Sequence, residues 1–202
     1  QSIQSYATLA TIIFQTNQNE QHGGQAIPAF DFFMAKGVNK SFRKHLSSFI
    51  SFYIAMETNT AVEEKAIRAL IEEHLPSIKT NELERETLRM ALTALQINID
   101  KEHLARVIEK AYQQTRKDTH QAMEGFIHNL NTMHSRGGNQ VVFSSINYGT
   151  DTSAEGRMVI EELLKATIEG LGTRGEVPVF PIQIFKVKDG VSYSEEDYQK
   201  AM

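Results

Sequence analysis

The sequence predicts a helix-dominated α/β fold, in which long antiparallel helices lead into a β–α–β unit. Apolar residues recur every three or four positions over most of the chain before residue 134, as on the buried face of a helix. Beyond that point two short apolar runs, Val141–Ile146 and Val179–Val187, flank one helical stretch, Ser153–Gly170. A strand, a helix and a strand with short links form a β–α–β unit with two parallel strands.

The first predicted element is a helix over residues 2–19, because its apolar residues lie at helical spacing. The polar, glycine-bearing sequence His22-Gly23-Gly24 indicates a loop. A short helix is then expected over Ala29–Lys36, and a second long helix beginning near Gly37 or Val38. The apolar face of this long helix consists of Phe42, Leu46, Phe49, Ile50, Tyr53 and Ile54.

Residues 58–96 predict two further helices separated near Pro76, because proline lacks a backbone donor and clashes with the preceding turn. The next helix is expected from about Asp100 to Met133, a length of about 50 Å at 1.5 Å per residue. A helix of that length indicates packing against another long helix or against a partner subunit. Ser153 is the expected N-cap of the helix in the β–α–β unit.

Composition excludes several classes of protein. The chain has 202 residues, a net charge of −4 and no cysteine, so it has no disulfide and no thiolate ligand. The acidic balance gives no sign of nucleic-acid binding. No apolar run reaches the roughly 18 residues of a membrane span, and no signal peptide is visible. We therefore expect a cytoplasmic protein that contacts neither nucleic acid nor membrane.

The two ends of the chain suggest an internal piece of a larger protein. Gln1 already lies in an amphipathic helical pattern, without an initiator methionine. The last residues, from Ser194, resemble the start of a helix that stops after barely two turns.

Polar residues gather at both ends of the first predicted strand, where α/β proteins place ligands. The turn before the strand spans His134–Gly138 and includes Ser135 and Arg136. Ser144, Ser145 and Asn147 lie in or directly after the strand, and alternation leaves open which serine faces a cavity. These groups either line a pocket or bond to neighbouring loops.

Other motifs favour structural roles. Gly170-Leu171-Gly172-Thr173-Arg174-Gly175 matches G-x-G-x-x-G, but a helix precedes it and a strand follows, so a helix C-cap and turn are expected. His120 and His128 lie eight residues apart on one helix without an evident acidic or histidine partner, so no metal site is predicted. Lys36, Lys40 and Arg43-Lys44-His45 form either a solvated helix face or a phosphate site.

Three segments resemble the anaerobic (class III, glycyl-radical) ribonucleotide reductase large subunit, in that family's order and spacing. The first is Ser2–Lys44, with the pattern SIxxxAT, Gln21-His22-Gly23-Gly24, Phe30-Asp31 and Gly37-Val38-Asn39-Lys40-Ser41-Phe42. The second comprises Gln121-Ala122-Met123, Asn131-Thr132-Met133-His134-Ser135-Arg136 and Asn147-Tyr148-Gly149-Thr150. The third comprises Gly170-Leu171-Gly172 and Pro178-Val179-Phe180-Pro181-Ile182.

The resemblance implies a homodimeric oxidoreductase that reduces ribonucleoside triphosphates to deoxyribonucleotides on a ten-stranded α/β barrel. It implies a glycyl radical, made by an activating enzyme that uses an iron–sulfur cluster and S-adenosylmethionine, a thiyl cysteine and a structural zinc site. None of these groups is expected in this chain, and neither is the N-terminal effector-binding cone domain. We therefore expect the isolated chain to be inactive and to have no catalytic residue of its own.

The resemblance also assigns regions. Residues 1–135 correspond to a helical dimerisation and effector region, and residues 136–202 to the first barrel strands with their crossover helix. The resemblance implies that the long helices form the homodimer contact and a specificity site, which binds a deoxynucleotide or ATP effector. Lys44 matches a lysine at that site, and Gln1 stands where some members have another lysine. His134, Ser135, Arg136, Ser144, Ser145 and Asn147 are the candidates for lining the substrate cavity.

Two other hypotheses remain open. The chain is alternatively a helical nucleotide-binding or dimerisation module without catalysis. A third possibility is an α+β scaffold with no ligand. Ultracentrifugation and titration with deoxynucleotides distinguish these two.

Overall fold

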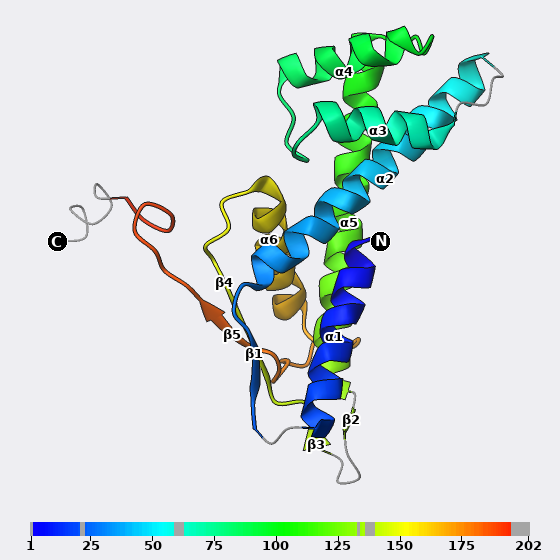
Figure 1. Ribbon diagram of the computed structural model, residues 1–202. Helices are drawn as coiled ribbons and strands as arrows, with labels where there is room; N and C mark the ends of the chain where they lie inside the picture. Colours follow the sequence, from blue (N-terminus) through cyan, green and yellow to red (C-terminus); the bar gives the residue numbers. More distant parts are fainter. Residues whose placement is uncertain (1, 21–22, 59–62, 133, 136–139, 195–202) are drawn as a thin grey trace. The chain divides into compact units, whose positions relative to one another are not determined.

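The computed structural model describes residues 2–20, 23–58, 63–132, 134–135 and 140–194, and its elements follow the predicted order closely (Figure 1). Its helices are α1 (Ile3–Glu20), α2 (Phe30–Thr58), α3 (Glu64–His74), α4 (Glu82–Ala94), α5 (Lys101–Thr132) and α6 (Ala154–Glu169). Its strands are β1 (Gln25–Ile27), β2 (His134–Ser135), β3 (Gln140–Val141), β4 (Ser144–Tyr148) and β5 (Ile182–Phe185). No helix in these ranges is long and apolar enough to cross a membrane.

The chain forms two compact units that do not follow its linear order. The sheet unit comprises residues 1–37 and 119–202, and the helical unit comprises residues 38–118. Helices α2 and α5 contribute residues to both. The helix-dominated α/β class is confirmed.

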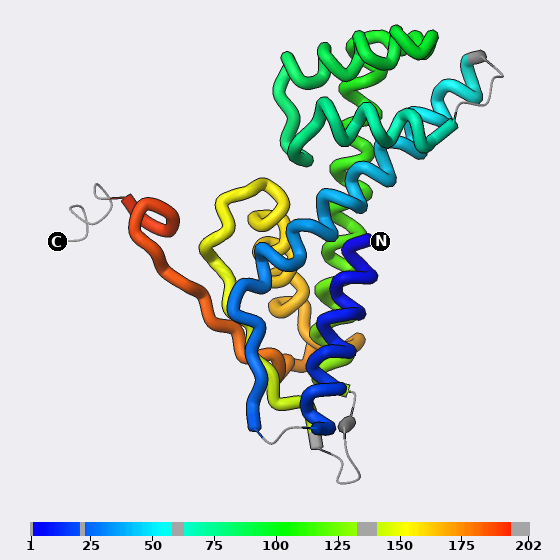
Figure 2. The backbone as a smooth tube through the Cα atoms, in the orientation of Figure 1, coloured from blue at the N-terminus to red at the C-terminus, as the bar shows by residue number. Residues whose placement is uncertain are grey.

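A three-stranded parallel sheet organises the sheet unit, in the order β1-β4-β5. Ser145 of β4 pairs with Ala26 of β1 and with Ile182 of β5. Figure 2 traces the path of the chain from β4 through α6 to β5. The predicted β–α–β unit with parallel strands is thus confirmed. Strand β1 was not predicted, because three residues after a glycine loop show no strand period.

Helix α6 covers one face of this sheet. The alternating burial of β4 places Ser144, Ile146 and Tyr148 on the covered face. The Tyr148 hydroxyl lies 2.9 Å from Gln183 Oε1, and Gln183 Nε2 donates to Thr167 Oγ1 of α6 at 2.7 Å. Burial raises the pKa of the Tyr148 hydroxyl, which therefore remains a donor at neutral pH.

Aromatic side chains join α1, α2 and α5 within the sheet unit. The ring of Phe126 lies 6.4 Å from that of Phe14 and 5.0 Å from that of Phe30, measured between centroids. All three side chains are fully buried. Burial of each contributes roughly 1.5–3 kcal/mol to folding, so this cluster is a main source of stability in the unit.

The two helices predicted on either side of Gly37 form one continuous helix, α2. A Cβ at Gly37 would lie 3.0 Å from the Tyr6 ring and 3.1 Å from the Cα of Ile3. The glycine therefore allows α1 to approach α2 closely, and it does not interrupt the helix. Close tertiary packing outweighs the low helix propensity of glycine here.

The helical unit contains α3, α4 and the adjoining parts of α2 and α5. Helix α4 begins with a capping box, in which the Asn81 side chain accepts from Glu84 N and the Glu84 side chain accepts from Asn81 N. The Asn39 side chain donates to Pro76 O at 3.1 Å, which ties α2 to the loop after α3. The predicted break near Pro76 is confirmed.

One predicted strand is divided in two. The run Val141–Ile146 contributes Val141 to β3, which pairs antiparallel with β2, and the residues from Ser144 to β4, which joins the parallel sheet. Val142 and Phe143 lie between them, and Phe143 O accepts from Gln25 N at 3.0 Å. Pairing partners decide this division, and a single apolar run contains no information about them. The helix expected from Ser194 lies almost entirely outside the described residues.

Candidate functional site

The carboxyl ends of the parallel strands are held in place by a buried carboxylate, that of Asp31. Its side chain is 0% exposed, and its Oδ2 accepts from the backbone N–H groups of Gly149 (2.9 Å), Thr150 (3.1 Å) and Asp151 (3.0 Å). Its Oδ1 accepts from Phe32 N at 3.1 Å. A carboxylate in the first turn of a helix is also stabilised by the helix dipole. Asp31 thereby attaches the start of α2 to the loop that leaves β4.

Glycine is required in this loop. Gly149 has φ 115°, and a Cβ there would lie 2.8 Å from Lys186 O. Beyond it, Asp151 Oδ1 accepts from Ser153 N at 2.8 Å, and a Cβ at Gly156 would lie 2.3 Å from the Asp151 carboxyl group. Ser153 accepts from Gly156 N at 3.0 Å, which confirms the predicted N-cap of α6.

A second polar side chain, that of Asn131 near the end of α5, fixes the approach to β5. Asn131 Oδ1 accepts from Val179 N at 2.9 Å and from Phe180 N at 3.1 Å. Asn131 Nδ2 donates to Phe180 O at 2.6 Å and to Ile127 O at 2.7 Å. Four hydrogen bonds from one amide leave little freedom to the segment that precedes β5.

The structure separates the two candidate serines on β4. Ser144 is buried on the face that α6 covers, and its hydroxyl donates to Val142 O at 3.2 Å. Ser145 and Asn147 point to the other face, because successive side chains of a strand alternate. The Ser145 hydroxyl donates to Gln25 O at 3.3 Å.

The face with Ser145 and Asn147 is less covered. Asn147 pairs with Ile184 and Ser145 with Ile182, and both isoleucines are exposed. Asn147 Oδ1 is a buried oxygen without a hydrogen-bond partner among the described residues. An unpaired buried carbonyl costs free energy, so this atom is suited to accept a hydrogen bond from a bound molecule.

The side chains of the other cavity candidates, His134, Ser135 and Arg136, lie outside the described part of the structure. His134 and Ser135 form β2, which pairs with β3 rather than lying in a free turn, and their side chains lie outside the described residues. Arg136 and Gln1 also lie outside them.

Lys44 lies exposed on α2, in the helical unit. Its neighbours are engaged within that unit: Arg43 pairs with Glu72 at 2.6 Å, and His45 Nε2 lies 2.7 Å from Asp118 Oδ2. No ion pair holds the Lys44 ammonium group within the described ranges. Exposed Lys40 lies one helical turn away.

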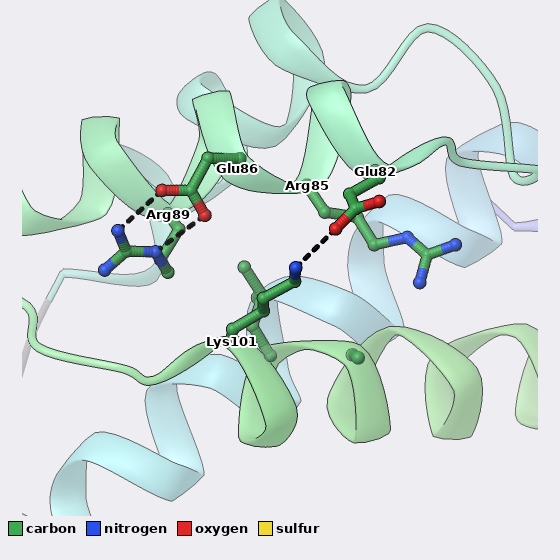
Figure 3. Close-up of a pocket in the computed structure, with 7 residues that line it drawn as sticks. Glu82, Arg85, Glu86, Arg89 and Lys101 are labelled. Atoms are coloured by element: carbon green, nitrogen blue, oxygen red, sulfur yellow. Dashed lines mark hydrogen bonds and ion pairs between the residues drawn. The ribbon is translucent and has the colours of Figure 1, made fainter.

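A charged hollow of about 320 Å³ lies between α4 and α5 in the helical unit (Figure 3). Lys101 from α5 bonds to Glu82, and Arg89 forms two bonds to Glu86, at 2.9 and 2.6 Å. These bonds lower the pKa of both carboxyl groups and raise the pKa of Lys101 and Arg89. Both carboxylates are thus paired, and the remaining cation, Arg85, donates to Thr80, which favours a structural role for the hollow.

His120 is a site residue that the sequence did not assign. Its two ring nitrogens face carboxylates from two helices of the sheet unit: Glu162 and Glu169 from α6, and Glu124 from its own helix α5. The i, i+4 spacing of His120 and Glu124 was the available signal in the sequence. The partners on α6 are more than forty residues away and could not be recognised from spacing.

Comparison with known proteins identifies a family that this chain matches. The family model described as anaerobic ribonucleoside-triphosphate reductase matches residues 1–202. The anaerobic ribonucleoside-triphosphate reductase of Enterobacteria phage T4 is 34% identical over 98 residues, which are 48% of this chain and 16% of that protein. The Escherichia coli (strain K12) protein of the same name is 32% identical over 87 residues, 43% of this chain and 12% of that protein.

The protein of that name from Haemophilus influenzae is 32% identical over 81 residues, 40% of this chain and 11% of that protein. The match therefore spans less than a fifth of the length of these relatives. Because the family model covers the chain from end to end, the chain belongs to the anaerobic ribonucleoside-triphosphate reductase family.

Proposed function

We propose that this chain is part of a large subunit that reduces ribonucleoside triphosphates to deoxyribonucleoside triphosphates. This proposal rests on the family match over all residues. The contacts made by residues of the resembling segments support it. Asp31 and Gly149, from two of the resembling segments, meet at one loop, and Asn131 binds the segment that leads to β5. The motifs thus act together to position the sheet.

The sheet β1-β4-β5 forms consecutive strands of a ten-stranded barrel in this proposal. Parallel strands joined by a covering helix are the building unit of α/β barrels. One face is covered by α6, as the outer face of a barrel is covered by helices. The face with Ser145 and Asn147 then points inward, toward the substrate.

Asn147 is the residue that we expect to contact substrate, because its Oδ1 is buried without a partner. In the intact enzyme, Asn147→Ala should raise KM for the ribonucleotide about fivefold, which corresponds to one lost hydrogen bond of about 1 kcal/mol. Ser144→Ala is the matched control, because Ser144 lies on the covered face of the same strand. Equal KM values for Asn147→Ala and the unaltered enzyme would remove Asn147 from the substrate site.

The helices supply the dimer contact and the effector site in this proposal. Helix α1 presents an exposed apolar stripe at helical spacing, formed by Leu9, Ile12 and Ile13. Such a stripe is unfavourable in water and favours burial against a second copy of the chain. Lys44 provides an exposed ammonium group for the phosphates of a deoxynucleotide or ATP effector. Gln1 lies outside the described residues and remains only a sequence-based candidate.

The effector role of Lys44 is tested in the intact dimer. Lys44→Ala should weaken effector binding without changing the fold, because the side chain is exposed. Lys79→Ala, which removes another exposed ammonium group of the helical unit, is the control. Equal effector affinity of Lys44→Ala and Lys79→Ala would contradict the assignment.

The radical chemistry belongs to other parts of the protein. The chain has no cysteine, so its residues do not fit the thiyl radical or a cysteine-ligated zinc site. The glycyl radical and its activating enzyme concern the intact protein, and no step of the reaction is assigned to this chain. Its contribution is to position substrate, effector and the second subunit.

The alternative is a helical nucleotide-binding or dimerisation module without catalysis. The apolar stripe of α1 favours it as a description of the isolated chain. Sedimentation equilibrium of the chain, compared with Ile12→Glu, tests self-association through α1. Titration with deoxynucleotides tests whether nucleotide binding persists.

A further inference from the structure

His120 and its carboxylates form a compact cluster within the sheet unit. His120 Nδ1 lies 3.1 Å from Glu162 Oε2, and His120 Nε2 lies 3.0 Å from Glu169 Oε2 and 3.8 Å from Glu124 Oε1. Ligand atoms of His120, Glu124 and Glu169 all lie within 4.8 Å of one another. Two helices, α5 and α6, hold the cluster together.

The cluster is asymmetric in its burial. The Glu162 side chain is only 5% exposed, and its other oxygen, Oε1, accepts from Lys165 Nζ at 3.0 Å. Glu169, by contrast, is 58% exposed, and Glu124 is similarly open to solvent. One side of the imidazole therefore faces a fixed, buried carboxylate, and the other faces two accessible carboxylates.

This arrangement favours a cation beside the ring. A neutral imidazole has one N–H donor and one lone pair. If Nδ1–H donates to buried Glu162, the Nε2 lone pair points toward two carboxylate oxygens, which is repulsive. A second proton or a metal ion at Nε2 removes the repulsion. Carboxylates that orient a histidine through its other nitrogen are a regular feature of zinc sites.

The distances from His120 Nε2 to the two outer carboxylates are compatible with a tetrahedral ion. Two ligands at about 2.1 Å from zinc lie about 3.4 Å apart at the tetrahedral angle. The two distances from Nε2, 3.0 and 3.8 Å, bracket this value. One imidazole and two carboxylates bring a charge of −2 to a divalent ion. The exposure of Glu169 (58%) and Glu124 (52%) leaves the outer side of the cluster open to water as a fourth ligand.

We propose that His120, Glu124 and Glu169 bind a Zn²⁺ ion, with Glu162 as the residue that orients the His120 ring. The site contains no cysteine and differs from the cysteine zinc site that the resemblance implies. It joins α5 to α6 and so ties the helical part of the sheet unit to the helix that covers the sheet. The expected role of the ion is therefore to stabilise this helix pair.

The proposal is tested by isothermal titration calorimetry, in which the untagged chain is titrated with Zn²⁺ alone. One ion per chain is expected. His120→Ala should abolish this binding, and Glu169→Gln should weaken it at least tenfold. Glu162→Gln should weaken it about 10- to 100-fold, because an orienting carboxylate is lost. Co²⁺ provides a second readout, since its visible absorption reports a nitrogen and oxygen ligand set and should disappear in His120→Ala.

Two control variants make the result specific. Glu161→Gln removes a neighbouring exposed carboxylate of α6 that bonds to Lys165, and it should bind Zn²⁺ as the unaltered chain does. His103→Ala removes an exposed histidine–aspartate pair in the helical unit, and it should also bind normally. Because Glu169 is exposed, circular dichroism of Glu169→Gln should match the unaltered chain.

Several outcomes would overturn the proposal. One is no saturable Zn²⁺ binding. Another is unchanged affinity in Glu169→Gln. A third is loss of binding in His103→Ala together with retention in His120→Ala.

Discussion

Single buried side chains determine how the loops of the sheet unit are held, and Asp31 is the clearest example. Its carboxylate serves three backbone N–H groups that are far away in the sequence. The Asn131 side chain likewise accepts a hydrogen bond from the distant backbone N–H of Val179. Both residues look unremarkable in the sequence, because a helix start and a helix end commonly have Asp and Asn. Their importance comes from the partners that the fold brings to them.

Removing the Asp31 carboxylate should strongly destabilise the chain. Asp31→Ala leaves four N–H groups without this acceptor, those of Phe32, Gly149, Thr150 and Asp151, and each unsatisfied buried donor costs about 1–3 kcal/mol. We expect a loss of at least about 3 kcal/mol in urea unfolding. Asp31→Asn, which retains one oxygen, should lose less. Glu20→Gln at the exposed end of α1 should be neutral, and equal midpoints for Asp31→Ala and Glu20→Gln would contradict this account.

Glu64 in the helical unit makes stability depend on pH. Hydrogen bonds from Ser47 (2.9 Å), Ser48 (3.1 Å) and Arg68 (2.9 Å) reach its Oε1. The bond from Ser47 is the main reason that the pKa of Glu64 lies below its ordinary value. A carboxyl group with a lowered folded pKa adds stability above its unfolded pKa. That contribution is lost as the pH falls through the lowered, folded pKa.

Ser47→Ala should therefore bring the pKa of Glu64 closer to its ordinary value. It should also reduce the loss in free energy of unfolding that occurs when the pH falls below the ordinary pKa of a glutamate. NMR titration of the Glu64 carboxyl carbon and urea unfolding across the acid range measure the two effects. Ser51→Ala, one turn further along α2, is the control, because the Ser51 hydroxyl has no partner among the described residues. An unchanged Glu64 titration in Ser47→Ala would be inconsistent with this explanation.

At the scale of elements, local sequence patterns predicted the helices well, and the errors occurred next to glycine residues. The apolar periods predicted α1, α5 and α6 within a few residues of their observed ends, and the proline break near Pro76 predicted the separation of α3 from α4. Gly37 suggested a break that does not exist, because α1 packs directly against it. Strand β1 was missed, because its hydrogen bonds to β4 decide its conformation and its own three residues do not.

Two helical glycines should respond oppositely to alanine. Gly37→Ala places a methyl group 3.0 Å from the Tyr6 ring, and overpacking of this kind typically costs about 1–3 kcal/mol. Gly125→Ala, in α5, adds a methyl group that meets no atom within 4 Å beyond its own stretch of helix. It should stabilise the chain by up to about 1 kcal/mol through helix propensity. Urea unfolding of the two variants measures both, and stabilisation by Gly37→Ala would refute the close approach of α1.

At the scale of the whole molecule, the fold is an assembly of non-adjacent segments. The sheet unit takes residues from both ends of the chain and leaves residues 38–118 to a separate helical unit. Lys44 belongs to the helical unit and Asn147 to the sheet unit. In the proposed function, effector contact and substrate contact therefore lie on different units of one chain.

The isolated chain should not reduce ribonucleotides. It has no cysteine to form a thiyl radical, so no residue of the chain can abstract hydrogen from ribose by that route. The assay is formation of deoxyribonucleoside triphosphate from radiolabelled ribonucleoside triphosphate under anaerobic conditions, with the intact enzyme as positive control. Product formed by the purified chain alone would contradict the assigned division of roles.

Local sequence by itself determined the helices, the Ser153 cap, the order of strand, helix and strand near the end, and the family resemblance. These features depend on residues within a few turns of one another. Tertiary structure alone decided the continuity of α2, the strand β1, the face shared by Ser145 and Asn147, and the partners of Asp31 and His120. Each of those depends on contacts between distant residues, such as Asp31 with Gly149 or His120 with Glu162. A hydrogen bond across that separation leaves no period in the sequence, so only the folded chain reveals it.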